Sequence, residues 1–230
     1  MEAPTSARGR ARRRAEAEER SADYRSGYPD APKSSASRDI WNFYNNKIKS
    51  EPRGDFIDVM LVEWKGNYEL LERHHGFIQW LFPLREAGIN WQASVMSAKE
   101  AQQIAASEAC RHRLVQAYRL MLDFYGFRLV DEATGALEPA ENFSSRIAFL
   151  NVSGHNYLRI SRILKSLGEL GFEHYKAPWI KMLIMLCFNG DKPPLRRAQA
   201  ACEFHWVYTL KNEAERLELL GLIDSLVKPA

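Results

Sequence analysis

Glu72 and His75 stand three residues apart in the sequence, a spacing that suits metal chemistry. In metal-binding helical bundles, a Glu-x-x-His pair places one carboxylate and one imidazole on the same ion. Such a site needs a second pair and two further glutamates on facing helices, and the sequence has no second pair. Because coordination requires the complete ligand set, we predict no metal site. We predict instead that His75 lies at a helix C-terminus, where the helix dipole favours its protonated form.

No sequence pattern for nucleophilic catalysis is present. The chain lacks the Gly-x-Ser-x-Gly turn of serine hydrolases and the phosphate-binding loop Gly-x-x-x-x-Gly-Lys-Ser. Its three cysteines, Cys110, Cys187 and Cys202, lie far apart and outside any Cys-x-x-Cys motif, so we expect core residues in a reducing compartment. We therefore predict that the protein is not an enzyme, has no catalytic residue and needs no cofactor. An active site would have to come from residues that meet only in the fold.

Basic residues offer a different chemistry, the binding of anions. Arg159, Arg162 and Lys165 fall on one side of an expected helix. There they would bind a phosphate, a peptide carboxylate or RNA, or form an ordinary solvated surface. The run from Arg8 to Arg14 has the composition of a nuclear import signal, of a loose contact to nucleic acid or anionic lipid, or of a solubilising tail.

The charge of the chain is unevenly distributed. Residues 1–14 hold five arginines and one glutamate, a net charge of +4, so the rest of the chain carries −1 of the overall +3. A nucleic-acid module ordinarily has a basic folded domain. We therefore predict no nucleic-acid partner for the folded part.

The segment 64–84 contains five aromatic residues, and Gln79 is the one polar side chain of its apolar part 77–84. Its part 77–84 is apolar but too short to span a bilayer, so we expect it to insert into the core. Once buried, Gln79 needs hydrogen-bond partners. We expect it to tie the loop to neighbouring backbone rather than to contact a ligand. Tryptophans beside polar groups also make good pockets for aromatic peptides, because a ring offers area and a hydrogen bond together.

Composition and apolar periodicity predict an all-α protein with a single non-repetitive domain. The 46% hydrophobic and 27% charged residues are typical of a globular protein. No apolar stretch is long enough for a membrane span, so any membrane contact should be peripheral. We expect a disordered Arg-rich tail over residues 1–38 and a helical domain over residues 39–230. At most one small β-hairpin is expected, after Phe127.

Apolar spacing and capping signals predict where the helices lie. We expect one helix over residues 55–73 with a bend or close packing at Gly66, since glycine is costly inside a helix. Ser97 and Glu100 should form a capping box, and Gly126 should end the helix that follows. The other expected helices cover residues 40–48, 143–150, 155–170 and 178–188, the last at the centre of the fold, then a helix through Tyr208 and one capped by Asn212.

Long strings of uncommon residues show a resemblance to a known family. They are Asn67-Tyr-Glu-Leu-Leu-Glu72 with His75, Phe77-Ile-Gln-Trp-Leu-Phe-Pro-Leu84, Asn90-Trp91, Met121-Leu-Asp-Phe-Tyr-Gly126, His155-Asn156 and the run from Leu158 to Gly171. The chain resembles the conserved domain of the opioid growth factor receptor family over roughly residues 40–210, and such strings are far more specific than a short motif.

The resemblance implies a non-classical opioid receptor, unlike the seven-helix receptors. Such a protein binds methionine-enkephalin (Tyr-Gly-Gly-Phe-Met), is found in the nucleus, at the nuclear envelope and in the cytoplasm, and restrains cell proliferation. Family members carry long polar C-terminal tails with repeats, so the resemblance of the conserved domain does not extend to partners that need such a tail. The rival hypothesis is a helical scaffold that binds a protein or RNA through the Arg159 stripe and the N-terminal tail.

If an enkephalin-type peptide binds, it needs an anion near its amine, apolar slots for its side chains and a cation near its carboxylate. We assign Glu69 or Glu72 to the first role and Arg159 or Arg162 to the last. The slots and the polar groups beside them are assigned to Trp64, Tyr68, His75, Gln79 and Trp80.

Overall fold

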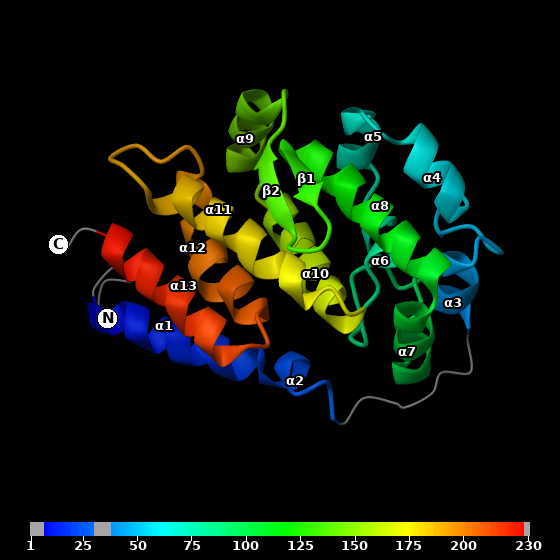
Figure 1. Cartoon of the computed structure of the whole chain (residues 1–230), viewed down its shortest axis with the longest axis horizontal. Helices are drawn as coiled ribbons and strands as arrows, with labels where there is room; N and C mark the ends of the chain where they lie inside the picture. Colours follow the sequence, from blue (N-terminus) through cyan, green and yellow to red (C-terminus); the bar gives the residue numbers. More distant parts are fainter. Residues whose placement is uncertain (1–6, 30–37, 228–230) are drawn as a thin grey trace.

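The computed structural model describes residues 7–29 and 38–227, in which helices surround one hydrophobic core (Figure 1). The first half contains α1 (Ala7–Arg20), α2 (Ala22–Arg25), α3 (Asp39–Tyr44), α4 (Ile57–Glu63), α5 (Tyr68–Arg73), α6 (Ile78–Leu81), α7 (Ala98–Ala106) and α8 (Glu108–Tyr125). The strands β1 (Phe127–Asp131) and β2 (Ala136–Pro139) form the one sheet of the described residues.

The second half is again helical, with several short irregular turns. It contains α9 (Phe143–Val152), α10 (His155–Glu169), η1 (Glu173–Tyr175), α11 (Lys176–Phe188), η2 (Arg196–Ala198), α12 (Gln199–Ala201), the π-helix η3 (Cys202–Trp206), η4 (Val207–Thr209) and α13 (Glu213–Leu226). The predicted all-α class and the single small hairpin are confirmed.

The helix α11 crosses the middle of the molecule and is buried on most sides (Figure 1). Its Trp179 is fully buried, with ring centroids of Tyr118 and Tyr125 on α8 at 5.6 Å and 6.1 Å. A helix without a polar face must be enclosed by other elements, and the predicted central position is confirmed. It begins at Lys176, two residues earlier than expected, because Pro178 is tolerated in a first turn.

Three predicted helix ends are confirmed. The Ser97 hydroxyl accepts a hydrogen bond from the Glu100 N–H at 3.2 Å, and the Glu100 carboxylate accepts one from the Ser97 N–H at 2.9 Å. This capping box opens α7. Gly126 ends α8 with a φ of 88°, a left-handed conformation that glycine adopts without steric cost. The Asn212 side chain caps α13 by accepting two backbone N–H groups.

The hairpin follows directly from this turn. Strands β1 and β2 pair antiparallel, with Phe127 opposite Pro139 and an irregular register between Leu129 and Asp131. Phe127 is buried against Trp179, with ring centroids 6.4 Å apart. The hairpin therefore covers one side of the central helix.

The single helix predicted over residues 55–73 is wrong. The segment forms two helices, α4 and α5, which are separated at Gly66. Gly66 has a φ of 74°, a conformation that stops an α-helix rather than bending it. Asn67 then caps α5, since its side chain accepts the Leu70 N–H at 3.1 Å.

The predicted insertion of residues 77–84 into the core is confirmed. Phe77, Leu81 and Phe82 are fully buried, and the short helix α6 lies inside the segment. The Trp80 indole N–H donates to the Glu51 carbonyl at 2.8 Å, so this buried ring keeps its polar atom satisfied.

The predicted disorder of the N-terminal tail is wrong for residues 7–29. We call these residues, which hold α1 and α2, the N-terminal arm; α1 lies beside α13 in Figure 1. Arg10 and Arg14 both pair with Glu203 and Asp224, and Tyr24 is buried. Composition does not reveal such pairing, because the acidic partners lie 189 to 214 residues away in sequence.

The remaining residues of the predicted tail, 1–6 and 30–37, lie outside the described residues. The division of the chain at residue 38 therefore stays a prediction. None of the helices in residues 7–29 and 38–227 is both long and apolar enough to cross a bilayer.

Candidate functional site

A cavity of about 730 Å³ runs along one face of α10. Its opposite wall comes mainly from the segment 75–92, and Arg20 and Ser21 of the N-terminal arm also line it. We call it the α10 cavity. The helix contributes His155, Leu158, Arg159, Ser161, Arg162 and Lys165. These positions follow helical spacing from residue 155 to residue 165, ten helical rises, so the lined face is about 15 Å long.

The rim of the α10 cavity carries large apolar side chains in contact with solvent. Ile89 is 89% exposed, Trp91 is 87% exposed and Leu158 is 61% exposed. Single exposed apolar residues are ordinary, but three around one concavity mark a binding surface. The chemistry of this rim suits aromatic or aliphatic groups of a ligand.

Gln79 forms part of the wall and shapes the loop beside it. With its amide oriented so that the oxygen faces the loop, Gln79 accepts the N–H groups of Ile89 at 3.2 Å and Asn90 at 2.5 Å. A Cβ on Gly88 would lie 1.8 Å from the Gln79 amide, so only glycine fits between them. The predicted structural role of Gln79 is confirmed, and the residue also lines the cavity.

Arg159 is a structural tie rather than a solvated surface residue. Its side chain is 6% exposed, and it donates to the carbonyls of Leu71 at 2.8 Å and of Glu72 and His74 at 3.2 Å. It thereby satisfies the free carbonyls at the end of α5. Its guanidinium is used mainly by the protein itself, and the solvated-face alternative is wrong for this residue.

Arg162 is the cation best placed to meet a ligand. Within the described residues its guanidinium makes one hydrogen bond, from Nε to the Phe82 carbonyl at 2.8 Å, and no ion pair. Burial lowers the pKa of Arg162 to about 10, so it stays charged at neutral pH. Its remaining N–H groups are available for a planar acceptor such as a carboxylate.

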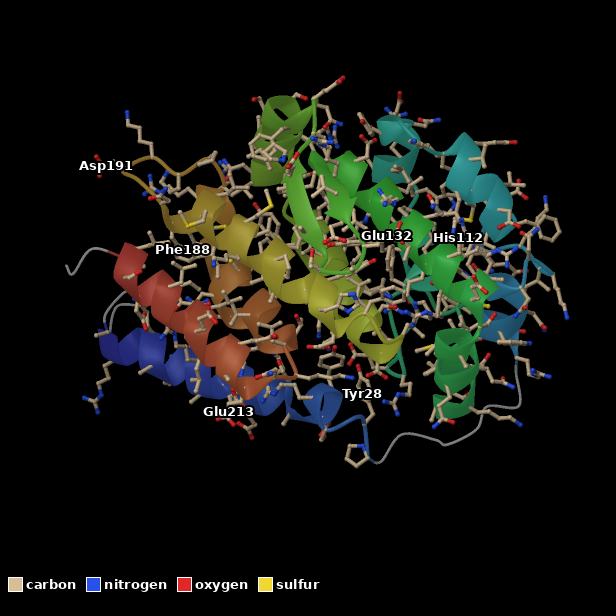
Figure 2. All side chains as sticks on the ribbon, viewed as in Figure 1. Tyr28, His112, Glu132, Phe188, Asp191 and Glu213 are labelled. Atoms are coloured by element: carbon tan, nitrogen blue, oxygen red, sulfur yellow. The ribbon has the colours of Figure 1, made fainter. Side chains whose placement is uncertain are left out.

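Glu86 is the one carboxylate among the described residues that line the α10 cavity. Lys165 Nζ contacts both of its oxygens, at 2.8 Å and 3.0 Å. Tyr28, which follows α2 in the chain and is labelled in Figure 2, donates its hydroxyl hydrogen to Glu86 at 2.9 Å. This carboxylate is already neutralised, so the lining remains positive through Arg20, Arg159 and Arg162.

The imidazoles of His75 and His155 line the α10 cavity near the N-terminus of α10, and the carboxylate of Glu72 lies beside them. Glu72 contacts His155 at 3.1 Å and accepts the Ser153 hydroxyl at 2.7 Å. Burial raises the pKa of Glu72, but hydrogen bonds from Asn156 and Ser153 outweigh it and leave that pKa below its usual value. The part of the chain that the structure describes holds no group of three potential metal ligands.

The predicted protonation of His75 is wrong. The helix α5 ends at Arg73, with His74 as an extended cap, so His75 lies beyond the dipole. Burial and the neighbouring Arg159 lower its pKa below the usual histidine value. His75 is therefore neutral at pH 7, and its ring stands 5.9 Å from that of His155.

The structure brings four of the predicted site residues together, namely His75, Gln79, Arg159 and Arg162. The other five do not line the cavity. Trp64 and Trp80 are buried in the core, and Tyr68 donates to Asp123 at 2.9 Å. Glu69 is exposed and pairs with Arg73. Glu72 does not line the cavity itself but contacts His155, which does.

Sequence reasoning missed Arg20, Glu86, Leu158 and Trp91 as lining residues. Leu158 carries a signal, since it lies on the same helical face as Arg159 and Arg162. Trp91 belongs to a string already singled out, but exposure cannot be read from residue type. Arg20 and Glu86 meet α10 only through the tertiary fold.

Comparison with known proteins identifies the family. The opioid growth factor receptor conserved region matches residues 34–229. The chain belongs to the opioid growth factor receptor family. It is 46% identical to the rat opioid growth factor receptor over 208 residues, which is 90% of this chain and 36% of the rat protein.

Other family members give the same result. The human opioid growth factor receptor is 45% identical over 84% of this chain and 29% of its own length. The mouse opioid growth factor receptor-like protein 1 is 41% identical over 90% of this chain and 44% of its own length. The chain thus spans less than half the length of these relatives. No solved structure matches it.

The family region contains the whole cavity lining except two residues. Arg20 and Ser21 belong to the N-terminal arm and precede residue 34, where the match begins. The opioid growth factor receptor family is named for a receptor. The lining of the α10 cavity combines exposed apolar side chains with arginines.

Proposed function

We propose that the α10 cavity binds a short enkephalin-type peptide, Tyr-Gly-Gly-Phe-Met or a close relative. The observation that carries this proposal is the combination of Arg162, which has free N–H groups, with the exposed apolar rim of Ile89, Trp91 and Leu158. A peptide with large side chains and a terminal carboxylate complements both features. Membership of the opioid growth factor receptor family supports the choice of peptide.

The dimensions of the cavity support a ligand of this size. Five extended residues span about 17 Å, close to the 15 Å of lined helix. In our assignment the carboxylate lies toward Arg162 and Lys165, and the amine lies toward His155, where Glu72 supplies negative charge. The apolar slots are assigned to Leu158, Ile89 and Trp91, which replace the buried Trp64 and Trp80.

We further propose that peptide binding serves to restrain cell proliferation and that the protein acts without catalysis. The proposal places it in the nucleus, at the nuclear envelope and in the cytoplasm, with peripheral membrane contact only. Nuclear import through residues 8–14 belongs to the same proposal. Family membership alone supports these points.

The test is calorimetric titration of Tyr-Gly-Gly-Phe-Met into the full chain, with a scrambled pentapeptide as the control ligand. We expect saturable binding of the true sequence alone. Arg162→Ala should weaken it at least about tenfold, the effect of losing one charge-assisted hydrogen bond. Arg73→Ala is the matched control, because Arg73 is exposed, pairs with Glu69 and lies outside the cavity. Equal binding of both peptides, or of neither, would refute the proposal.

A further inference from the structure

We infer that the N-terminal arm is a working wall of the α10 cavity and that Arg20 on it binds the carboxylate end of the peptide, together with Arg162 and Lys165. Arg20 would then be a specificity-determining residue that lies outside the matched family region. The inference rests on the proposed function, since it concerns how the same peptide is recognised.

Ion pairs fix α1 against the C-terminal part of the domain. Arg10 contacts Glu203 at 2.9 Å and Asp224 at 3.2 Å, and Arg14 contacts the same two carboxylates at 2.8 Å. Glu203 is 4% exposed, so its charge needs these partners. The pairing orients the helix so that its last residue, Arg20, reaches the cavity.

A second anchor links the arm directly to cavity residues. Tyr24 is 1% exposed and donates its hydroxyl to the Lys165 carbonyl at 3.1 Å. The Nζ atoms of Lys165, Lys176 and Lys211 lie 5.1 to 5.4 Å from the centre of its ring. Lys165 therefore contacts the arm through Tyr24 and the cavity through Glu86.

In the part of the chain that the structure describes, Arg20 is held by one hydrogen bond, and its other N–H groups are available for a ligand. Its Nη2 donates to the Phe204 carbonyl at 2.8 Å, and within the described residues it forms no ion pair. A guanidinium has five N–H donors, so the others remain for an acceptor in the cavity. Arg162, also on the cavity lining, has no carboxylate partner within residues 7–29 and 38–227, whereas Lys165 is already paired with Glu86.

The positive charge at the Arg20 end of the α10 cavity favours a ligand that ends in a carboxylate. Arg20, Arg162 and Lys165 face one carboxylate, Glu86, so a neutral ligand end would leave two guanidinium groups without a counter-charge. A peptide carboxylate supplies that charge and accepts bidentate hydrogen bonds. A carboxamide of the same size supplies neither, so the free acid should be preferred.

Binding and arm docking are then coupled. A carboxylate held between Arg20 and Arg162 stabilises the docked arm, and by linkage a docked arm raises the affinity for the carboxylate by the same factor. Occupied cavities should consequently protect the arginines of α1 from trypsin.

The experiment compares Tyr-Gly-Gly-Phe-Met with its C-terminal amide on the full chain. We expect the wild type to prefer the free acid at least about tenfold. Arg20→Gln should lower affinity for the acid by a similar factor and leave the amide unchanged. Arg12→Gln is the control, since Arg12 lies on the same helix, is 78% exposed and pairs with Glu16.

A second variant keeps the test valid if Arg20→Gln itself releases the arm. Glu203→Gln combined with Asp224→Asn removes the anchor without touching the cavity, and it should lower affinity for the acid only and speed tryptic cleavage of α1. Equal affinity of acid and amide for the wild type, or unchanged selectivity in both variants, would overturn the inference while the proposed function stands. Failure of the wild type to bind either peptide would instead overturn the proposed function.

Discussion

Arg159 caps the C-terminus of α5, a helix that lies 88 residues away in the sequence. Its Nη1 donates to the carbonyl of Leu71 at 2.8 Å. Two further carbonyls of the same turn, those of Glu72 and His74, accept from its Nη2. This contact joins α10 to the end of α5, directly before the segment 75–92 that forms the opposite wall of the α10 cavity. Arg162, which donates to the Phe82 carbonyl, and Lys165, which pairs with Glu86, add further links between the two sides of the cavity.

Arg159→Ala should destabilise the protein strongly. The substitution leaves the buried carbonyl of Leu71 and the partly buried carbonyls of Glu72 and His74 without this donor. Such losses cost about 3 kcal/mol in the free energy of unfolding. Urea unfolding measures it, with Arg73→Ala as the control, which should change stability by less than about 0.5 kcal/mol. Equal effects of the two substitutions would contradict the tie between α10 and α5.

Gly88→Ala should damage the cavity wall. The added Cβ would lie 1.8 Å from the Gln79 amide and 3.0 Å from Arg162 Nη1, so both side chains must move. We expect a loss of about 1–3 kcal/mol in stability and a clear loss of peptide affinity.

Gly221→Ala is the matched control for Gly88→Ala. A Cβ at Gly221, within α13, meets no atom within 4 Å, so alanine should stabilise the helix by about 0.5–1 kcal/mol. Unfolding curves and peptide titrations of both variants decide the matter. A Gly88→Ala protein with normal stability and affinity would show that the loop is not held as described.

Trp91→Ala should separate binding from stability. The ring is 87% exposed, so its removal should change the free energy of unfolding by less than about 0.5 kcal/mol. Loss of an aromatic contact area should nevertheless weaken peptide binding about tenfold or more. Val62→Ala, at a residue that is 76% exposed and away from the cavity, should change neither quantity. The prediction fails if Trp91→Ala leaves peptide affinity intact.

Stability should decrease as the pH falls from about 7 toward 5.5. Burial and Arg159 lower the pKa of His75, and burial and Arg20 lower the pKa of His205. Below the ordinary histidine pKa the unfolded chain thus binds more protons than the native chain, so the free energy of unfolding drops. Urea titrations at pH 7.5 and 5.5 should show this, and His75→Gln with His205→Gln should reduce the difference. An unchanged difference in the double variant would assign the pH dependence to other groups.

Local signals predicted the elements whose causes are local. The capping box of Ser97 and Glu100, the stop at Gly126 and the central apolar helix follow from residue type and spacing. Gly66 was recognised as a weak point, but its positive φ depends on where the two flanking helices pack. The sequence therefore predicted one helix over residues 55–73 where the structure has two, α4 and α5.

The candidate site was predicted only in part, for a physical reason. Gln79 stood out because an amide inside an apolar segment must find partners, and Arg162 stood out because it shares one side of a helix with Arg159 and Lys165. Which aromatic residues are buried and which are exposed depends on tertiary packing: Trp80 is 3% exposed and Trp91 is 87% exposed, although both belong to the same recognisable strings. The ion pair of Arg10 with Glu203 cannot be predicted from local sequence, because the two residues are 193 positions apart.

The boundary of the family region has a consequence for how relatives differ. The α10 cavity has most of its lining within residues 34–229, but Arg20 and Ser21 come from before that region. A relative that keeps the whole region and carries another leading segment would have the same apolar rim beside a differently charged end. Exchanging leading segments between relatives would then alter which ligand termini are accepted while the domain itself stays the same.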